Sequence, residues 1–339
     1  MRVLVLVWGR QVETLQASPL LRSIAAGDPD GTVTLACSPA AAQAGRALDG
    51  VTEVLTLRGL DPHGSPTDRL VAWARLRRLR YDYAVLCGSA ARARWIVYLA
   101  GFARRVGPGG GLSTALLSDR VRPRKHENQA ATWLRMALIL GIAAERHQPH
   151  LEPGLMATQQ ALVQLHSTAM ADGRLLVALA PGAGHTDLHR NHADAASWEP
   201  ERWAHLANQL ATRHGAGIIF VGAAEDQAVT MAASVDIAAP HADVTGQLDL
   251  LATAALLRKC DLLVSGDSPL LHLAAAVGTP TIGIFGPTDG RRRGAYGSEH
   301  RVVQALPAPH SRRLPHHGAD LLMNQIRVED VLAAIETSL

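Results

Sequence analysis

Short apolar runs alternate with helix-like segments along this chain, and this alternation constrains the fold more than any other feature. Each run has the length of a buried strand, and in the segment that follows apolar residues recur every three or four positions. Strands buried on both faces and separated by helices are typical of a parallel, doubly wound α/β sheet. The expected strands are Val3–Val7, Thr32–Ala36, Val51–Leu57, Tyr83–Leu86, Leu175–Ala180, Ile218–Val221, Leu262–Val264 and Thr281–Phe285.

The alternation breaks once and then restarts, which predicts two domains. Residues 106–128 are expected to form a loop, and the turn-rich ADGR at 171–174 is the expected linker. A chain of 339 residues is long enough for two hydrophobic cores. We therefore expect an N-terminal Rossmann-like domain over 1–170 and a C-terminal one over 171–339, with a central cleft between them. The last helix, at 328–339, could pack back toward the first domain.

Several classes of protein are disfavoured by what the sequence lacks. Neither half carries GxGxxG or GxxxxGK[ST], which argues against NAD and P-loop binding. The three cysteines are far apart and no CxxC or HExxH pattern occurs, so neither a disulfide framework nor a metal site is expected. No run approaches the roughly 18 apolar residues of a membrane helix. These features favour a cytoplasmic protein.

The net charge of +3 conceals an asymmetry between the halves. Residues 1–170 hold 20 Lys/Arg and 12 Asp/Glu, a net of +8, whereas residues 171–339 hold 13 and 18, a net of −5. A basic half can attract an anionic partner, although arginines scattered over a solvated surface explain the count equally well. No basic motif interleaved with aromatic residues indicates nucleic acid.

The strongest local signal is VSGDSPLLHLAAAVGTPTIGIFGPTD at 264–289. Asp267 and Ser268 follow an expected strand, and Ser268 with Pro269 is typical of a helix start. A helix N-terminus at the carboxyl edge of a sheet binds phosphate, and His272, one turn later, could donate a proton or a hydrogen bond to an anion. A capped core helix without a ligand explains the same residues.

Two weaker signals stand elsewhere. The small residues of LAPGAG at 179–184 would let a ligand approach the backbone closely, as would any ordinary turn. Glu13 follows the first strand and could act as a general base, although a Glu in the first helical turn also simply favours the helix dipole.

Taken together, these residues resemble glycosyltransferase family 9, the heptosyltransferase-like family, whose GT-B architecture has two facing Rossmann-like domains. The resemblance covers nearly the whole chain. Pro19-Leu20-Leu21-Arg22 is similar to a helix of the family, and counting back places the family's Gly-Asp pair at Val12-Glu13. The resemblance therefore implies that Glu13 is the catalytic carboxylate, with Val and Glu as departures from the pattern.

The second half resembles the family more closely. Its similar segments are LAPGAG, SWEPERWAHLA, VGAAEDQ, TGQLDLLATAALL and GDSPLLHLAAAVGTPTIGIFGPTD. Pro269 replaces a Gly of the family, and Ala196 stands at the position of its lysine, so Arg190 or His192 is expected to replace that cation. The donor-binding positions that the resemblance implies are Gly182, Ala183, Arg190, Glu225, Gly246, Gln247, Asp267, Ser268, Pro269 and His272.

The resemblance implies an inverting, metal-independent transfer of a sugar, such as a heptose from an ADP-sugar, onto an acceptor hydroxyl without a cofactor. The acceptor would be a glycan, a lipid-linked glycan core or a small metabolite, and the enzyme a monomer or weak dimer, cytoplasmic or peripheral at the inner face of the membrane. Two alternatives remain: a nucleotide-sugar epimerase or hydrolase on the same fold, and a nucleotide-sugar-binding protein that has lost turnover.

Overall fold

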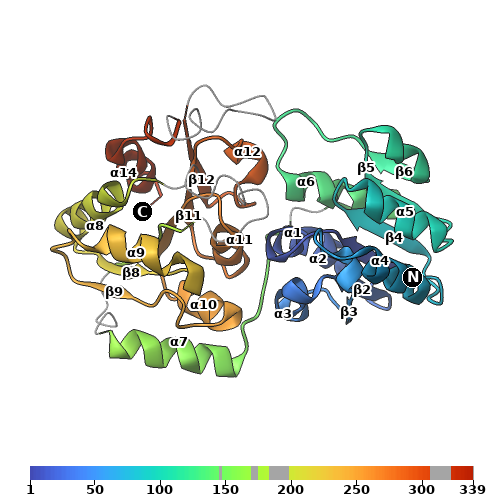
Figure 1. Ribbon diagram of the computed structural model, residues 1–339, viewed down its shortest axis with the longest axis horizontal. Coiled ribbons are helices and arrows are strands. Elements are labelled where there is room, and N and C mark those ends of the chain that lie inside the picture. The colour runs from blue at the N-terminus through green and yellow to red at the C-terminus, as the bar shows by residue number, and fades with distance from the viewer. Residues whose placement is uncertain (145–146, 169–174, 183–197, 306–321, 339) are drawn as a thin grey trace. The chain divides into compact units, whose positions relative to one another are not determined.

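The computed structural model of the protein describes residues 1–144, 147–168, 175–182, 198–305 and 322–338 (Figure 1). The chain divides into two compact units, Met1–Glu152 and Pro153–Leu339. Each unit contains a six-stranded sheet in which all pairings are parallel. The expectation of two doubly wound α/β domains is therefore confirmed.

The sheet of the first unit has the order β3-β2-β1-β4-β5-β6. Its strands are β1 (Arg2–Val7), β2 (Thr32–Cys37), β3 (Glu53–Thr56), β4 (Tyr83–Cys87), β5 (Arg105–Pro108) and β6 (Asp119–Val121). The helices of this unit are α1 (Gln11–Gln16), α2 (Ser18–Gly27), α3 (Ala42–Ala47), α4 (Pro66–Leu76), α5 (Ala91–Leu99) and α6 (Gln129–Leu134). Its 3-10 helices are η1 (Pro39–Ala41), η2 (Arg58–Leu60), η3 (Leu112–Leu116) and η4 (Arg135–Leu140).

The sheet of the second unit has the order β12-β11-β10-β7-β8-β9. Its strands are β7 (Leu176–Ala180), β8 (Gly217–Phe220), β9 (His241–Asp243), β10 (Leu262–Ser265), β11 (Thr281–Phe285) and β12 (His300–Gln304). The helices around it are α7 (Leu155–Ser167), α8 (Pro200–His214), the 3-10 helix η6 (Ala224–Asp226), α9 (Gln227–Ser234), α10 (Leu250–Leu257), α11 (Pro269–Ala276), α12 (Gly290–Arg293) and α14 (Val328–Glu336).

The central strands form where the sequence is continuously apolar. Every residue of β7 is buried, as are the five residues of β1 after Arg2, because helices cover both faces of each sheet. The helix expected after Pro200 is also confirmed. It begins at that proline and ends at His214, and the next residue, Gly215, caps it with a φ of +63°, a conformation that glycine adopts without a steric penalty.

Four strands were not expected from the sequence. β6 and all but the first residue of β5 lie inside 106–128, which was expected to be a loop, and β9 and β12 were also missed. β6, β9 and β12 are edge strands, and β5 contains Gly107 and Pro108. The short strands β6 and β9 contain few residues with an intrinsic strand preference, so the neighbouring strand that supplies their hydrogen bonds determines their conformation.

The boundary between the units differs from the expected one. α7 was expected to belong to the N-terminal domain, but it packs against α10 and so belongs to the second unit. The last helix, α14, packs against α8, β11 and β12 of its own unit. Its buried residues Val328, Val331 and Ile335 join the hydrophobic core that also contains Trp198 and Trp203. This core accounts for the apolar face of α14.

No helix within the described ranges has both the length and the apolar character needed to cross a membrane.

Candidate functional site

The carboxyl edge of the second sheet has the geometry of a ligand site. β7 lies at the centre of the sheet, between β8 and β10. The strands that follow it first continue on one side, to β8 and β9, and then on the other side, from β10 to β12. In doubly wound sheets, ligands bind outside the carboxyl ends of the strands at such a switch point. Ala180 at the end of β7 is paired with Ser265 at the end of β10. Gly182 and Asp267, two residues beyond these strand ends, therefore follow neighbouring strands at one edge.

The start of α11 is capped as the sequence predicts. The Ser268 hydroxyl accepts the backbone N–H of Leu270 at 3.2 Å, and Pro269 occupies the first helical turn. The Ser268 and Ser265 hydroxyls are also 2.8 Å apart, and both residues are buried. These contacts fix the direction of the helix, and its N-terminal dipole lies at the carboxyl edge of the sheet.

Arg293 is the site residue that sequence reasoning missed. Its Nε donates to Oδ2 of Asp267 at 2.7 Å, and the Asp267 side chain is only 5% exposed. The Arg293 side chain is 22% exposed, and among the described residues no other contact engages its terminal nitrogens. The run Arg291–Arg293 directly after GPTDG was the available signal, but an arginine run usually lies on a solvated face.

His272 is buried one turn into α11 and is neutral at pH 7. Its pKa is lowered to about 4, mainly because the charged ring loses its hydration on burial and in smaller part because the cation of Arg293 is nearby. Asp267 and a hydrogen bond to the backbone of Arg293 act in the opposite direction. The sequence suggested that His272 donates a proton or a hydrogen bond to an anion. The structure shows a neutral ring that is hydrogen-bonded to the backbone of Arg293, the residue whose guanidinium Asp267 holds.

A second buried carboxylate explains Gly182. Oδ2 of Asp226 accepts the backbone N–H of Ala223 at 2.9 Å and thereby closes the turn after β8. A Cβ added at residue 182 would overlap the Asp226 carboxyl group, and one added at Gly222 would lie 3.1 Å from it. Gly182 is thus required for packing at this edge, and Asp226 was not singled out from the sequence.

Gly246 and Gln247 follow β9 at the same edge of the sheet. Gly246 has a φ of +73°, and its N–H donates to the carbonyl of Gly222 at 3.0 Å. The amide of Gln247 is held at both ends: its Nε2 donates to Asp243, and its Oε1 accepts from Gln164 of α7 at 2.9 Å. Residues 247–249 and α7 line a pocket of about 430 Å³.

Three expected donor positions remain: Glu225, Ala183 and Arg190. Glu225 is exposed on η6, and the pocket beside Gln247 does not include it. Ala183 and Arg190, together with His192 and Ala196, lie outside the described residues.

Glu13 lies in the first unit, in the first turn of α1 after β1. Its Oε2 accepts the backbone N–H of Arg10 at 3.0 Å, which closes the turn between the strand and the helix. A Cβ at Gly9, where φ is +151°, would lie 2.5 Å from that oxygen, so the carboxylate rests directly on Gly9. Among the described residues no contact engages Oε1. The carboxylate therefore has both a capping role and one oxygen available for chemistry.

No group of three or more His, Cys, Asp or Glu side chains within the described ranges could hold a metal ion. The cysteines Cys37, Cys87 and Cys260 are free and buried.

The fold defines a class of protein. The solved structure of a family 9 glycosyltransferase from Veillonella parvula matches this chain with a TM-score of 0.80 at 18% identity, covering 99% of this chain and 96% of that chain. The Escherichia coli heptosyltransferase WaaC, solved with ADP, matches with a TM-score of 0.73 at 20% identity, with 100% of both chains covered. The fold is thus the GT-B fold of these glycosyltransferases.

The sequence identifies the family within that class. The profile of glycosyltransferase family 9 (heptosyltransferase) matches residues 69–316. Lipopolysaccharide heptosyltransferase 2 of Escherichia coli is 25% identical over 249 residues, which covers 70% of this chain and 69% of that protein. This chain therefore belongs to glycosyltransferase family 9 and is a glycosyltransferase. Glu13 precedes the first residue of the profile match, so the match carries no information about its role.

Proposed function

We propose that this enzyme transfers a heptose or a related sugar from an ADP-sugar onto the hydroxyl of a glycan acceptor, with inversion and without a metal ion. Relatives support the donor class: one is named a lipopolysaccharide heptosyltransferase, and a solved heptosyltransferase of the same fold contains ADP. The acceptor class follows from the same relative, whose name specifies lipopolysaccharide.

The cluster of Asp267, His272 and Arg293 carries the donor side of the proposal. An unpaired Asp267 carboxylate at the start of α11 would repel a diphosphate. The ion pair between Asp267 and Arg293 offsets that repulsion. Because Asp267 binds only the Nε of the guanidinium, the two terminal nitrogens can donate to phosphate oxygens. His272 holds the backbone of the same arginine. Arg293 thus supplies the positive charge that the family's lysine supplies, although that lysine stands at the position that Ala196 occupies here.

The N-terminus of α11 adds a second attraction for the diphosphate. Backbone N–H groups in the first turn of a helix point outward, and the helix dipole favours an anion there by about 0.3–1 kcal/mol at an exposed site. These donors are fixed before the reaction begins, so they stabilise the charge that develops on the leaving ADP without reorganisation. Because Arg293 and these N–H groups meet the phosphates, the proposal requires no divalent metal.

Glu13 is the proposed general base. The acceptor oxygen forms a bond to the anomeric carbon as the bond between that carbon and the β-phosphate oxygen breaks, and the bonding pair leaves with ADP. The hydroxyl proton passes to Oε1 of Glu13, while Oε2 keeps its bond to the Arg10 N–H. A positioned base of this kind typically contributes about 10²–10⁴ in rate. A single displacement of this kind inverts the anomeric centre.

The test is a transfer assay with ADP-heptose and a heptose-accepting lipopolysaccharide core, run with excess EDTA and with added magnesium. We expect the same rate in both conditions and a product of inverted anomeric configuration by NMR. A strict requirement for magnesium or manganese would refute the metal-free proposal. Retention of configuration would refute the direct displacement, and hydrolysis of the donor without transfer would point to a hydrolase.

A further inference from the structure

The outer face of α4 and α5 in the first unit carries large apolar side chains that the core does not use. The two helices contact each other and pack on one face of the sheet through Ala72, Leu76, Ala93 and Ile96 (Figure 1). Five apolar side chains remain outside that core, between 46% and 64% exposed: Leu70, Val71, Trp95, Tyr98 and Leu99. We call these five residues, with the arginines described below, the α4–α5 face. Apolar groups gathered on one face indicate an interaction surface.

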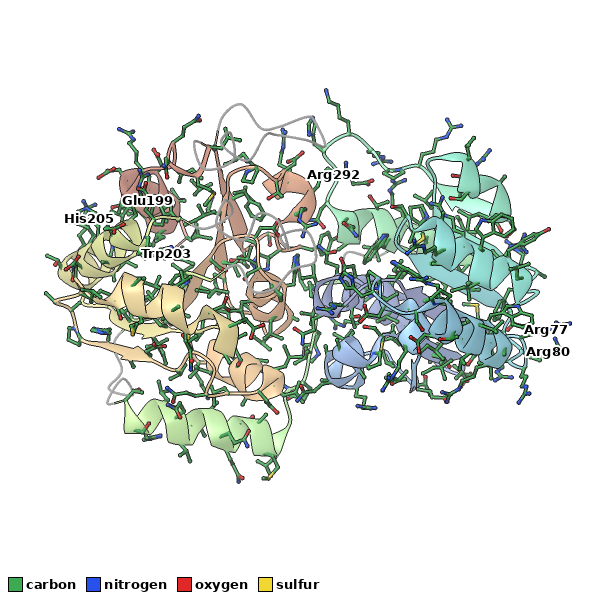
Figure 2. All side chains as sticks on the ribbon, in the orientation of Figure 1. Arg77, Arg80, Glu199, Trp203, His205 and Arg292 are labelled. Carbon is green, nitrogen blue, oxygen red and sulfur yellow. The ribbon has the colours of Figure 1, made fainter. Side chains whose placement is uncertain are left out.

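The same face is strongly basic. Residues 66–105 contain nine arginines and two aspartates, a net of +7. Both aspartates are committed to backbone groups: Asp68 accepts from Ser65 at the start of α4, and Asp82 accepts from Arg2. Five arginines are exposed and have no carboxylate partner among the described residues: Arg75, Arg77, Arg78, Arg80 and Arg92. Figure 2 shows Arg77 and Arg80 extending outward beyond the end of α4.

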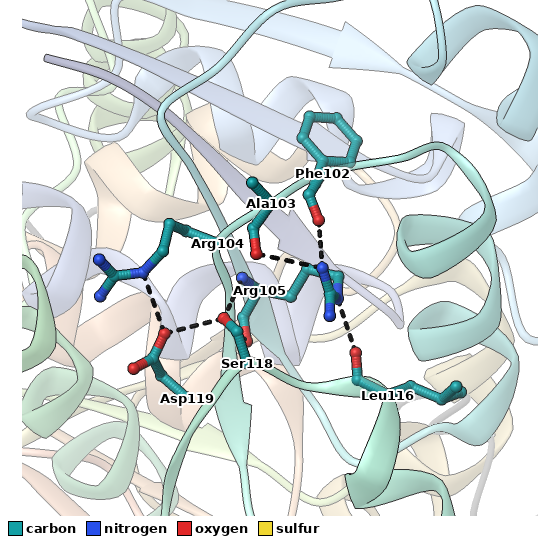
Figure 3. Close-up of polar contacts among 7 residues, drawn as sticks. All are labelled: Phe102, Ala103, Arg104, Arg105, Leu116, Ser118 and Asp119. Atoms are coloured by element: carbon teal, nitrogen blue, oxygen red, sulfur yellow. Dashed lines mark hydrogen bonds and ion pairs between the residues drawn. The ribbon is translucent and has the colours of Figure 1, made fainter.

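Three other arginines of this segment bind groups within the protein, which distinguishes them from the exposed ones. Arg104 pairs with Asp119 at 3.1 Å, and the Arg105 guanidinium donates to the carbonyls of Phe102, Ala103 and Leu116 (Figure 3). Arg94 is buried and donates to the carbonyls of Pro108 and Gly110. These three side chains stabilise the chain after α5, so the structure already accounts for them. Of the five exposed arginines only Arg77 has such a contact among the described residues, since its guanidinium lies over the Trp73 ring at 5.5 Å.

We propose that the α4–α5 face docks on an anionic lipid surface. Trp and Tyr are amphipathic and favour the interface of a membrane, where aliphatic side chains enter the acyl region and arginines meet the headgroup phosphates. Each cation near an anionic membrane strengthens binding about fivefold. A second copy of this chain fits less well, because a symmetric dimer would place the same arginines opposite each other. The proposal concerns docking only and does not depend on the donor or on the role of Glu13.

The test is flotation of the full-length protein with vesicles of phosphatidylcholine, with and without phosphatidylglycerol, at low and high salt. Two variants address the face: Arg78→Glu with Arg80→Glu changes its charge, and Trp95→Ser with Leu99→Ser removes its apolar contact. Two matched controls lie in the second unit. Arg258→Glu with Lys259→Glu makes the same change of charge at exposed positions, and Met231→Ser with Val235→Ser removes side chains that are 67% and 74% exposed.

We expect the wild type to bind the anionic vesicles and to lose binding at high salt. Each face variant should lower the partition coefficient by about tenfold or more, while both controls stay within about twofold. Circular dichroism and the melting temperature identify any variant that fails to fold. The proposal is overturned if the wild type binds neutral and anionic vesicles equally, or if the charge control loses as much binding as the face variant. A dimer interface is the third outcome that overturns it. In that case the wild type does not bind vesicles, light scattering shows that it is a dimer, and the variant Trp95→Ser with Leu99→Ser is a monomer.

Discussion

The buried ring of His272 makes the second unit sensitive to acid, and this sensitivity can be measured. The folded protein holds the pKa of His272 at about 4, against 6.5 for an unperturbed histidine, because burial disfavours the charged form. Between these two values the unfolded chain binds more protons than the folded one. Stability is therefore fully present above the unfolded pKa and is lost as the pH falls from 6.5 toward 4.

The magnitude follows from the size of the shift in pKa. The full difference between 6.5 and about 4 is worth about 3 kcal/mol, and at about pH 5 roughly 2 kcal/mol of it is lost. His272→Gln removes the titrating ring. The variant has its own cost from repacking at a buried position, but that cost is the same at each pH. The free energy of unfolding of the wild type should therefore fall by about 2 kcal/mol more than that of the variant between about pH 7 and pH 5.

Hydrogen exchange measured on peptides that cover β10 and α11 reports the unfolding free energy of this unit, after correction for the intrinsic exchange rate at each pH. His205→Gln is the matched control, because His205 is exposed on α8 of the same unit (Figure 2). Burial also lowers the pKa of His300 to about 4, so His300→Gln should remove a further part of the acid sensitivity. Equal losses of stability in the wild type and in His272→Gln would refute the neutral buried ring.

Three further predictions concern the site. Arg293→Ala should weaken ADP binding by about 10- to 100-fold in calorimetry, since it removes charge-assisted bonds, and should destabilise the fold by about 3–5 kcal/mol by leaving Asp267 buried and unpaired. Adding Asp267→Asn should restore much of the stability but not the affinity, whereas unchanged affinity in Arg293→Ala would exclude this arginine as a phosphate ligand. Glu13→Gln should lower the transfer rate by about 10²-fold or more with ADP affinity unchanged, and a rate near that of the wild type would place the base elsewhere. Gly182→Ala should lower the free energy of unfolding by about 1–3 kcal/mol, because the new Cβ overlaps the Asp226 carboxyl group; an unchanged melting temperature would mean that this carboxyl group moves aside at no cost.

The sequence by itself determined the features that depend on local patterns. A continuously apolar segment such as Val3–Val7 has few folded environments other than a strand buried on both faces. Ser268 with Pro269 marks the start of α11 because capping uses only the backbone groups of the next few residues. The order of these signals along the chain was sufficient to predict two doubly wound domains and one phosphate-type helix start.

Only the tertiary structure decided which distant residues share an environment. Arg293 reaches Asp267 across 26 positions of the chain, and the burial that keeps His272 neutral comes from the elements packed around it. α7 has the local pattern of any amphipathic helix, so its assignment to the second unit depends on its packing against α10. Local preferences and caps extend over a few residues, whereas ion pairs, burial and edge-strand pairing depend on how the whole chain closes on itself.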